Sequence, residues 1–146
     1  MNISGSGKLE IVAENEGLGS EMHMTINGGD IKIKSGNDGI NTSEDNISVF
    51  TMNDGNVSIQ VTGETGEGDG IDSNGWLIVN GGSVNTASCA TSSDAGIDAD
   101  KGIYINGGTV VASGNMAAEI ADGEQHAVSF MSREKLEAGE KYEIKD

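Results

Sequence analysis

Acidic and amide side chains recur at matching positions in two neighbouring segments, each of which opens with Gly-Ile. Asp72 and Asn74 follow the first Gly-Ile, and Asp98 and Asp100 follow the second. If the segments are adjacent turns of a repeat, Asp72 stacks over Asp98 and Asn74 over Asp100, about 4.8 Å apart as in paired strands. Stacked carboxylates repel each other unless a cation is present, and oxygen-only ligands at about 2.3 to 2.6 Å suit calcium. The pattern therefore predicts a calcium site.

Further acidic and amide residues flank this pair of turns. Asn41 occupies the same column one turn earlier. Asp38 and Asp69 form a parallel column just before the glycine of their turns, and Asp94 is offset from it by one residue. We expect these residues to complete the calcium site or to hold a second ion. Alternatively, Asp and Asn occur here because they favour turns beside Gly through local side-chain to backbone hydrogen bonds.

The acidic positions recur because the whole sequence repeats. Asn-Gly-Gly begins at Asn27, Asn80 and Asn106, with a degenerate copy at Asn53, so the steps are 26, 27 and 26 residues. Self-similarity at this period is typical of solenoids, and the unit is too short and too rich in glycine for a helical repeat. We expect the four asparagines to stack into a ladder of side-chain amides in a buried corner, with the following glycines supplying positive φ.

Apolar residues alternate with polar ones on both sides of each corner, which is typical of short strands. Aligned on the corner, the apolar positions form columns on three sides of a coil: Met24, Phe50, Leu77 and Ile103; Ile26, Met52, Val79 and Ile105; Ile31, Val57, Val84 and Val110; and Leu18, Ile40, Ile71 and Ile97. This predicts an all-β fold, a parallel β-helix of about four to five turns over residues 1–114. Residues 115–146 should cap it, with strands at 127–131 and 141–144 and a helical turn or loop at 133–136.

Composition agrees with one small domain of short strands and tight turns. The chain has 146 residues, including 23 Gly and no Pro. Its 24 acidic and 8 basic residues give a net charge of −16, which argues against nucleic acid or an anionic membrane as a direct partner. No apolar run is long enough for membrane insertion, and the single Cys89 excludes an internal disulfide framework. We expect a monomer.

Catalytic interpretations find little support in the repeats. Polysaccharide lyases built on parallel β-helices combine calcium with an Arg or Lys base. Here the one Arg, Arg133, lies in the expected cap, and the repeats carry Lys32, Lys34 and Lys101. The many Asp pairs leave glycoside hydrolysis by paired carboxylates open, but that reaction needs an environment that raises one carboxyl pKa, and exposed turns offer little of it.

Two aromatic residues indicate a surface for sugars. Trp76 and Tyr104 lie at even offsets before their Asn corners on adjacent turns, so both side chains should face away from the core. Aromatic faces on a flat sheet pack against the CH faces of pyranose rings. Alternatively, either ring covers the edge of a neighbouring loop.

The chain resembles bacterial cell-surface carbohydrate-binding domains with a calcium-binding right-handed parallel β-helix. The resemblance covers roughly residues 5–120 and is carried by Ile26-Asn27-Gly28-Gly29, Asn37-Asp38-Gly39-Ile40-Asn41, Gly68-Asp69-Gly70-Ile71-Asp72-Ser73-Asn74-Gly75, Ile105-Asn106-Gly107-Gly108-Thr109-Val110 and Gly114-Asn115-Met116-Ala117. It implies a right-handed coil, bound calcium, and binding to cellulose or to acidic polygalacturonate-type chains. Ala95 departs from the pattern because it replaces the acidic residue before Gly-Ile.

The residues and the resemblance together favour non-catalytic, calcium-dependent binding of a polysaccharide, either an acidic pectic chain or a cellulosic one. The chain would act as a module of a secreted or cell-surface protein. A polysaccharide lyase-like enzyme and a structural or adhesive solenoid are the alternatives.

Overall fold

The computed structural model describes residues 1–63, 65–121, 125–132, 134, 137 and 139–143. Within this part the chain forms strands and no helix. The strands are β1 (Asn2–Ile3), β2 (Lys8–Ala13), β3 (Leu18–Ser20), β4 (His23–Ser35), β5 (Ile40–Thr42), β6 (Val49–Val61), β7 (Ile71–Ser73), β8 (Trp76–Val79), β9 (Ser83–Ala87), β10 (Gly102–Ile105) and β11 (Thr109–Ser113). Their pairings are parallel throughout.

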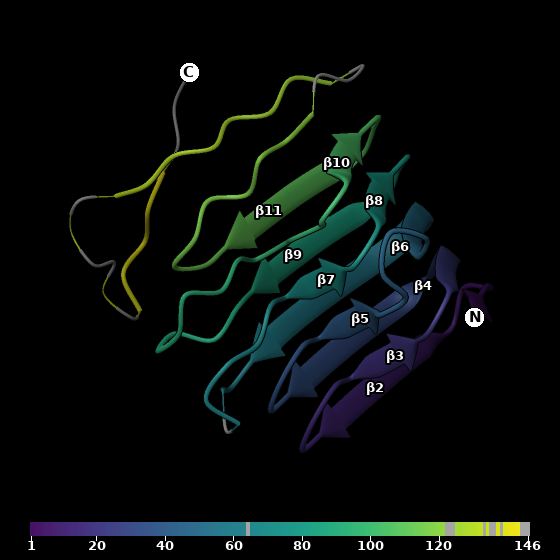
Figure 1. Ribbon diagram of the computed structural model, residues 1–146, viewed down its shortest axis with the longest axis horizontal. Helices are drawn as coiled ribbons and strands as arrows, with labels where there is room; N and C mark the ends of the chain where they lie inside the picture. Colours follow the sequence, from purple (N-terminus) through teal and green to yellow (C-terminus); the bar gives the residue numbers. More distant parts are fainter. Residues whose placement is uncertain (64, 122–124, 133, 135–136, 138, 144–146) are drawn as a thin grey trace.

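The strands stack as a β-solenoid of about four turns, as the sequence predicts (Figure 1). In the larger sheet, β1, β4, β6, β8 and β10 follow one another on one side of the corner. On the other side β4 and β6 also pair with β2 and β9, and β9 pairs with β11, because the two long strands bend through the corner. A second sheet of β3, β5 and β7 closes the coil.

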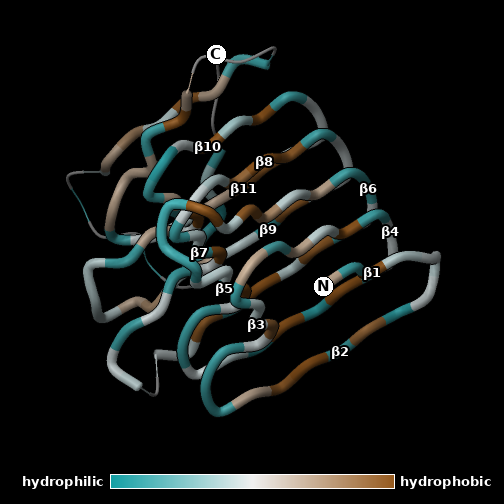
Figure 2. Tube along the Cα trace, turned by 45° about the vertical axis from the view of Figure 1, so that its right-hand side comes forward, coloured by the Kyte–Doolittle hydropathy of each residue, from teal (hydrophilic) through white to brown (hydrophobic). Residues whose placement is uncertain are grey.

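The apolar columns point inward and form one continuous core. Parallel pairing places Ile40 against Ile71 and Phe50 against Leu77, and these four side chains are fully buried. Apolar stretches follow the strands, whereas hydrophilic ones follow the connecting bends (Figure 2). At the two ends of the coil the columns are less well covered, since Leu18 and Val110 are only half-buried.

The Asn-Gly-Gly corners form the expected amide ladder, but its side chains are exposed rather than buried. The Nδ2 to Oδ1 hydrogen bonds measure 2.7 Å from Asn53 to Asn27, 2.8 Å from Asn80 to Asn53 and 2.9 Å from Asn106 to Asn80. The register between β4 and β6 shifts at this corner, where Asn27 pairs with Asp54, yet the Asn53 side chain still joins the ladder. Gly82 has φ 81°, and a Cβ there would lie 2.5 Å from the carbonyl oxygen of the corner beneath it.

The second turn contains an inserted loop, residues 42–48, which is anchored by buried hydroxyl groups. The Thr42 hydroxyl donates to the Ser73 hydroxyl at 2.8 Å, and the Ser48 hydroxyl donates to the Thr42 carbonyl oxygen at 2.8 Å. All three side chains are buried. These bonds fix the bend that follows Asp72, and they hold the insertion against the coil.

The C-terminal part of the chain differs from the expected cap. Ile120 forms a parallel bridge with Ile103, and the N–H of Ala121 donates to the Ile103 carbonyl oxygen at 2.9 Å. The prediction of a strand at residues 127–131 is wrong, because these residues pair with no strand and Val128 is 80% exposed. Residues 141–143 form no strand either, whereas Arg133 and residue 144 lie outside the described residues.

The described part of the chain contains no helix with the length and hydrophobicity needed to cross a bilayer. Its only secondary structure is the set of short strands that builds the coil.

The ladder generates a prediction about stability. Asn80 donates to one neighbour and accepts from the other, whereas Asn106 makes a single ladder bond at the end of the row. We expect Asn80→Ala to lower the free energy of unfolding by about 1 to 2 kcal/mol and Asn106→Ala by about half as much, measured by urea denaturation. Asn85→Ala, an exposed change on β9, is the control. Equal effects of Asn80→Ala and Asn85→Ala would contradict the structural role of the ladder.

Candidate functional site

Three carboxylates meet on the outside of the coil beside the three-stranded sheet. Asp69 lies just before β7, Asp72 lies on β7, and Asp98 follows the bridge between Ile71 and Ile97. One carboxylate oxygen of each lies within 4.8 Å of the others. The parallel pairing of Ile71 with Ile97 causes this arrangement, because it puts the following residues, Asp72 and Asp98, at the same position on adjacent turns.

The cluster binds protons unusually tightly. Burial, followed by the charges of Asp38 and Asp69, raises the pKa of Asp72 to about 7. Burial, followed by the charges of Asp38 and Asp94, raises the pKa of Asp69 to about 6, although a hydrogen bond from the Ala95 N–H opposes this shift. The expectation that these turns would not raise a carboxyl pKa is therefore wrong. Either a proton or a cation stabilises the cluster near neutral pH.

A second group of polar side chains continues the cluster one turn earlier. Asn41 is in register with Asp72, and its Nδ2 donates to Asp38 Oδ2 at 2.9 Å and to Glu16 Oε1 at 3.4 Å. The Asn41 Oδ1 atom is buried and has no hydrogen-bond partner. Burial raises the pKa of Asp38, and burial with the charge of Asp38 raises the pKa of Glu16. An unpartnered oxygen beside two acids is a free ligand for a cation.

Sequence reasoning missed Glu16. It precedes Gly17-Leu18, in the column that Asp38 and Asp69 occupy before their own glycines. The sequence does contain the pattern that marks Glu16, because Gly17-Leu18 is the first of the pairs in which Gly precedes an apolar residue, as at Gly39-Ile40 and Gly70-Ile71. Aligning the residue before each glycine across all turns would have found it.

The acidic residues that precede the glycines of successive turns also stabilise the coil. Asp38 Oδ1 accepts a hydrogen bond from the N–H of Asp69 at 2.8 Å, and Asp69 Oδ1 accepts one from the N–H of Ala95 at 2.6 Å. Asp94 Oδ2 likewise accepts from the N–H of Gly68 at 2.8 Å. The alternative reading of these residues as turn formers is thus partly right, although the bonds join successive turns rather than neighbours in sequence. Asp69 Oδ2 keeps its capacity to bind another group.

Asn74 and Asp100, two further expected ligands, lie outside both the three-carboxylate group and the group around Asn41. Asn74 Nδ2 donates to the Ser43 carbonyl oxygen at 3.0 Å and to Asp45 Oδ1 at 2.7 Å, so its amide is directed towards the inserted loop. Asp100 is exposed and does not join the three-carboxylate group, although its charge raises the pKa of Asp72. The insertion, which has no counterpart on the other turns, accounts for the different direction of Asn74.

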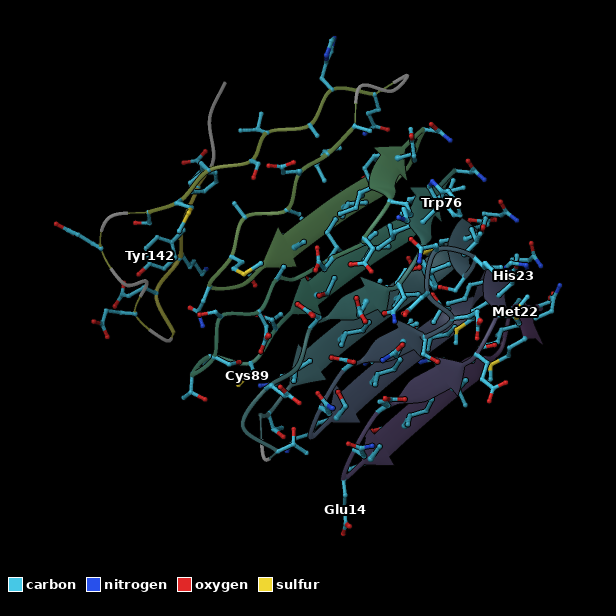
Figure 3. All side chains as sticks on the ribbon, viewed as in Figure 1. Glu14, Met22, His23, Trp76, Cys89 and Tyr142 are labelled. Carbon is cyan, nitrogen blue, oxygen red and sulfur yellow. The ribbon has the colours of Figure 1, made fainter. Side chains whose placement is uncertain are left out.

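The two aromatic residues lie on the outer face of the larger sheet. Trp76 on β8 is in register with Gly102 on β10, and Tyr104 is in register with Ile78. A Cβ at Gly102 would lie 3.3 to 3.7 Å from ring atoms of Tyr104, so the ring leans over the glycine that faces Trp76. Figure 3 shows Trp76 and His23 along the same margin of the solenoid. This margin is separate from the carboxylates, which belong to the other sheet.

The outer face thus offers a flat aromatic surface, and the side of the coil offers a compact set of oxygen ligands. The three carboxylates within 4.8 Å of one another could hold a divalent cation, with Asn41 Oδ1 as a further oxygen nearby. Trp76 and Tyr104 are half-buried, so each keeps part of its ring exposed to solvent. Together these surfaces fit a protein that binds a sugar chain.

Comparison with known proteins supports this interpretation. A family model described as "Carbohydrate-binding domain-containing protein" matches residues 1–146. Neither the curated proteins nor the solved structures gave a significant match. Because the family model spans every residue of the sequence, the chain belongs to this family of carbohydrate-binding domain-containing proteins.

Proposed function

We propose that this domain binds polysaccharide without cleaving it, that calcium is needed for its acidic ligands, and that it is a module of a secreted or cell-surface protein. The observation that carries the proposal is the group formed by Asp69, Asp72 and Asp98, whose oxygens lie within 4.8 Å of one another. Membership of a carbohydrate-binding family supports a sugar as the ligand.

Calcium fits the donor set for a simple electrostatic reason. The three carboxylates carry like charges, and the pKa values of Asp69 and Asp72 are raised, so a divalent cation can replace the proton that otherwise relieves the repulsion. In this proposal Asp69, Asp72 and Asp98 hold the ion, and Asn41 Oδ1, in register with Asp72 on the adjacent turn, is an unpartnered oxygen that can add to them. Oxygen-only coordination favours calcium over zinc or copper.

The net charge explains why an acidic glycan would need the ion. With a net charge of −16 the domain repels a polyuronate chain, because repulsion between like charges acts over longer distances than a single contact does. A calcium ion at the cluster attracts the carboxylates of such a chain. A neutral glucan meets no such repulsion, and it would use the faces of Trp76 and Tyr104 instead.

The positions of the lysines relative to the carboxylate cluster favour binding over a lyase reaction. Lys8 forms an ion pair with Asp30 on the larger sheet, where β2 pairs with β4. Lys32 and Lys34 lie on the outer face of β4, in the other sheet. No described Lys forms an ion pair with the three carboxylates, and Lys101, which follows Asp100, is exposed.

The raised pKa of Asp72 keeps glycoside hydrolysis as a second candidate function. A carboxyl group with a pKa of about 7 can remain protonated as a general acid, and two other carboxylates lie beside it. Hydrolysis would release new reducing ends from a polygalacturonate chain, whereas a lyase would release unsaturated uronate. Binding without either product is the outcome that we expect.

The proposal predicts two separable modes of binding. Polygalacturonate should be retained in calcium and lost in chelator, whereas cellulose binding should change little between the two conditions. Asp72→Asn with Asp98→Asn should weaken the calcium-dependent mode by at least about tenfold and spare cellulose. Trp76→Ala should weaken the free energy of binding to cellulose by about 1 kcal/mol or more and spare the calcium-dependent binding of polygalacturonate. Affinity electrophoresis and cellulose pull-down measure the two modes.

Matched controls test the residue assignments. Asp100→Asn removes one negative charge close to the site from a residue that lies outside the three-carboxylate group, so it should preserve the calcium-dependent mode. Val111→Ala removes an exposed apolar group from β11 and should preserve cellulose binding. If both site variants bind both polymers as the unchanged protein does, the assigned residues are wrong.

The raised pKa values also predict the pH dependence of the metal-free protein. Asp69 and Asp72 bind protons more tightly in the folded state, at pKa values of about 6 and about 7, than at the ordinary value of 3.8 in the unfolded state. Their contribution to stability is therefore full below about pH 4 and is lost as the pH rises towards 7. We expect a larger free energy of unfolding at pH 5 than at pH 7.5, and a smaller difference for Asp72→Asn. Equal differences in urea denaturation would exclude this role of Asp72.

A further inference from the structure

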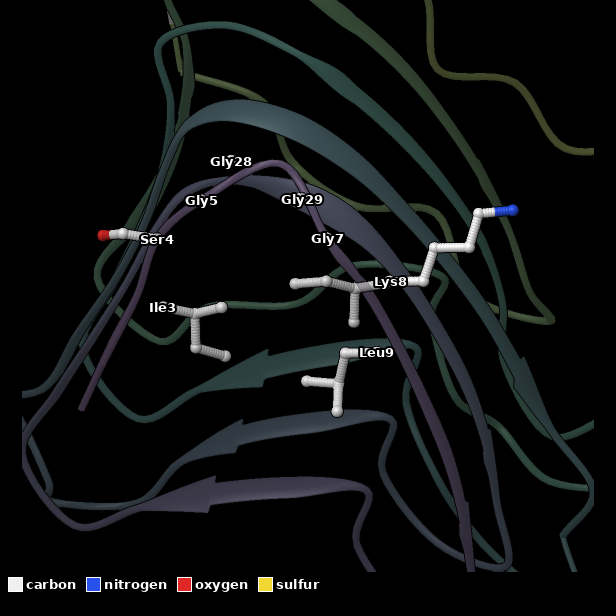
Figure 4. Close-up of a pocket in the computed structure, with 9 residues that line it drawn as sticks. Ile3, Ser4, Gly5, Gly7, Lys8, Leu9, Gly28 and Gly29 are labelled. Atoms are coloured by element: carbon white, nitrogen blue, oxygen red, sulfur yellow. The ribbon is translucent and has the colours of Figure 1, made fainter.

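Three of the four lysines in the repeats lie on one side of the coil, the part of the larger sheet that follows the Asn corners. Lys8 is on β2, and Lys32 and Lys34 are on β4. Side chains alternate along these strands, and Figure 4 shows Leu9 directed into the coil and Lys8 directed away from it. The register between β2 and β4 places Lys32 and Lys34 on the outer face as well, and both are exposed.

This side of the coil carries few carboxylates, although the net charge of the chain is −16. Residues 56–61 of β6, together with β9 and β11, expose hydroxyl, amide and aliphatic side chains and no acid. The carboxylates on its strands are those of Glu10 on β2 and Asp30 on β4, and Lys8 lies 3.8 Å from Asp30. The charges of Lys32 and Lys34 therefore face a largely neutral surface.

The two lysines on β4 have no ion-pair partner within the described part of the chain. Lys34 is in register with Val12 on one side and Gln60 on the other, so neither adjacent turn offers it a carboxylate. Lys32 is in register with Glu10, which offsets part of its charge. As alternate residues of one strand, the two lysines have Cα atoms about 6.6 Å apart. Lys34 thus meets the least competition from the protein's own acids.

We propose that Lys32 and Lys34, together with Ser58 and Gln60 on the adjacent turn, form a second contact surface for the acidic sugar chain. These four residues are the lysine face. All four side chains are exposed, and none has a hydrogen-bond partner among the described residues. The ammonium groups bind carboxylates of the chain directly, and the amide and hydroxyl groups exchange hydrogen bonds with its hydroxyl groups.

Charge complementarity selects an acidic chain as the occupant rather than a neutral one. A neutral glucan gains nothing from the ammonium groups. Beyond the corners, the strands of this side contain no Phe, Trp or Tyr on which its rings could stack. Among anionic polymers, membership of a carbohydrate-binding family favours a sugar chain.

The lysine face adds to the proposed calcium site and does not replace it, so this inference rests on the proposed function. Two ammonium groups do not offset a net charge of −16, and the repulsion of a polyuronate persists without calcium. The carboxylate cluster lies beside the three-stranded sheet, whereas the lysine face lies on the larger one. Once calcium holds one segment of a polymer, a second segment reaches the lysine face at a high effective concentration.

Affinity electrophoresis of the full chain in calcium, through gels with and without polygalacturonate, tests the lysine face. Lys32→Gln with Lys34→Gln should raise the dissociation constant about three- to tenfold. Lys32→Arg with Lys34→Arg keeps the charge and the capacity to bind carboxylates, so it should remain within about twofold of the original. Lys101→Gln with Lys141→Gln makes the same change in net charge at exposed positions outside the face, and should also remain within about twofold.

Further readouts separate this inference from the proposed function. The protein with Lys32→Gln and Lys34→Gln should keep its calcium-dependent melting temperature and its binding to cellulose. Unchanged binding of polygalacturonate by this variant, or an equal loss in the Lys101 and Lys141 control, would overturn the lysine face and leave the calcium site standing. If the original protein binds polygalacturonate equally well in chelator, the calcium requirement is wrong, and weaker binding by the glutamine variant there would still support the face. A chain that binds no polygalacturonate in either condition overturns both.

Discussion

Where the strands of this solenoid pair, each residue lies about 4.8 Å from the residue at the same position on the next turn, and the rest of the structure depends on that constraint. Isoleucine stacked on isoleucine makes a core, as at Ile40 and Ile71. Asparagine stacked on asparagine makes a ladder, because an amide both donates and accepts. Carboxylate stacked on carboxylate makes neither, because two anions at this distance repel each other.

The acidic column is thus the part of the repeat that stacking alone does not stabilise. The protein partly resolves the conflict by using one oxygen of Asp38 and one of Asp69 to accept backbone N–H groups on the next turn. Burial, followed by the charges of the neighbouring carboxylates, raises the pKa of Asp72 to about 7. Asp72 is thus held close to two other carboxylates and binds a proton near neutral pH. A divalent cation that binds to the three carboxylates can displace this proton. The proposed calcium site follows from the same repetition that builds the fold.

Features that depend on stacking could be read from the sequence, whereas those that break the repeat could not. The core columns, the corners and the neighbours of Asp72 follow from aligning the turns. The direction of Asn74 does not, because it depends on Asp45 in an insertion that no other turn contains. The non-strand conformation of residues 127–131 was equally hidden, because their alternating pattern has no partner strand. The pKa of Asp72 was underestimated because the alignment gives no measure of burial.

The central claim is that Asp69, Asp72 and Asp98 bind calcium, and thermal unfolding during a calcium titration tests it most directly. Because calcium would bind the folded cluster and not the unfolded chain, the melting temperature should rise continuously with calcium concentration. Asp72→Asn with Asp98→Asn should melt higher than the original protein without metal, since the repulsion is gone, and should respond little to calcium. If calcium leaves the melting temperature of the original protein unchanged, or raises it equally in the double variant, the carboxylate cluster is not the calcium site.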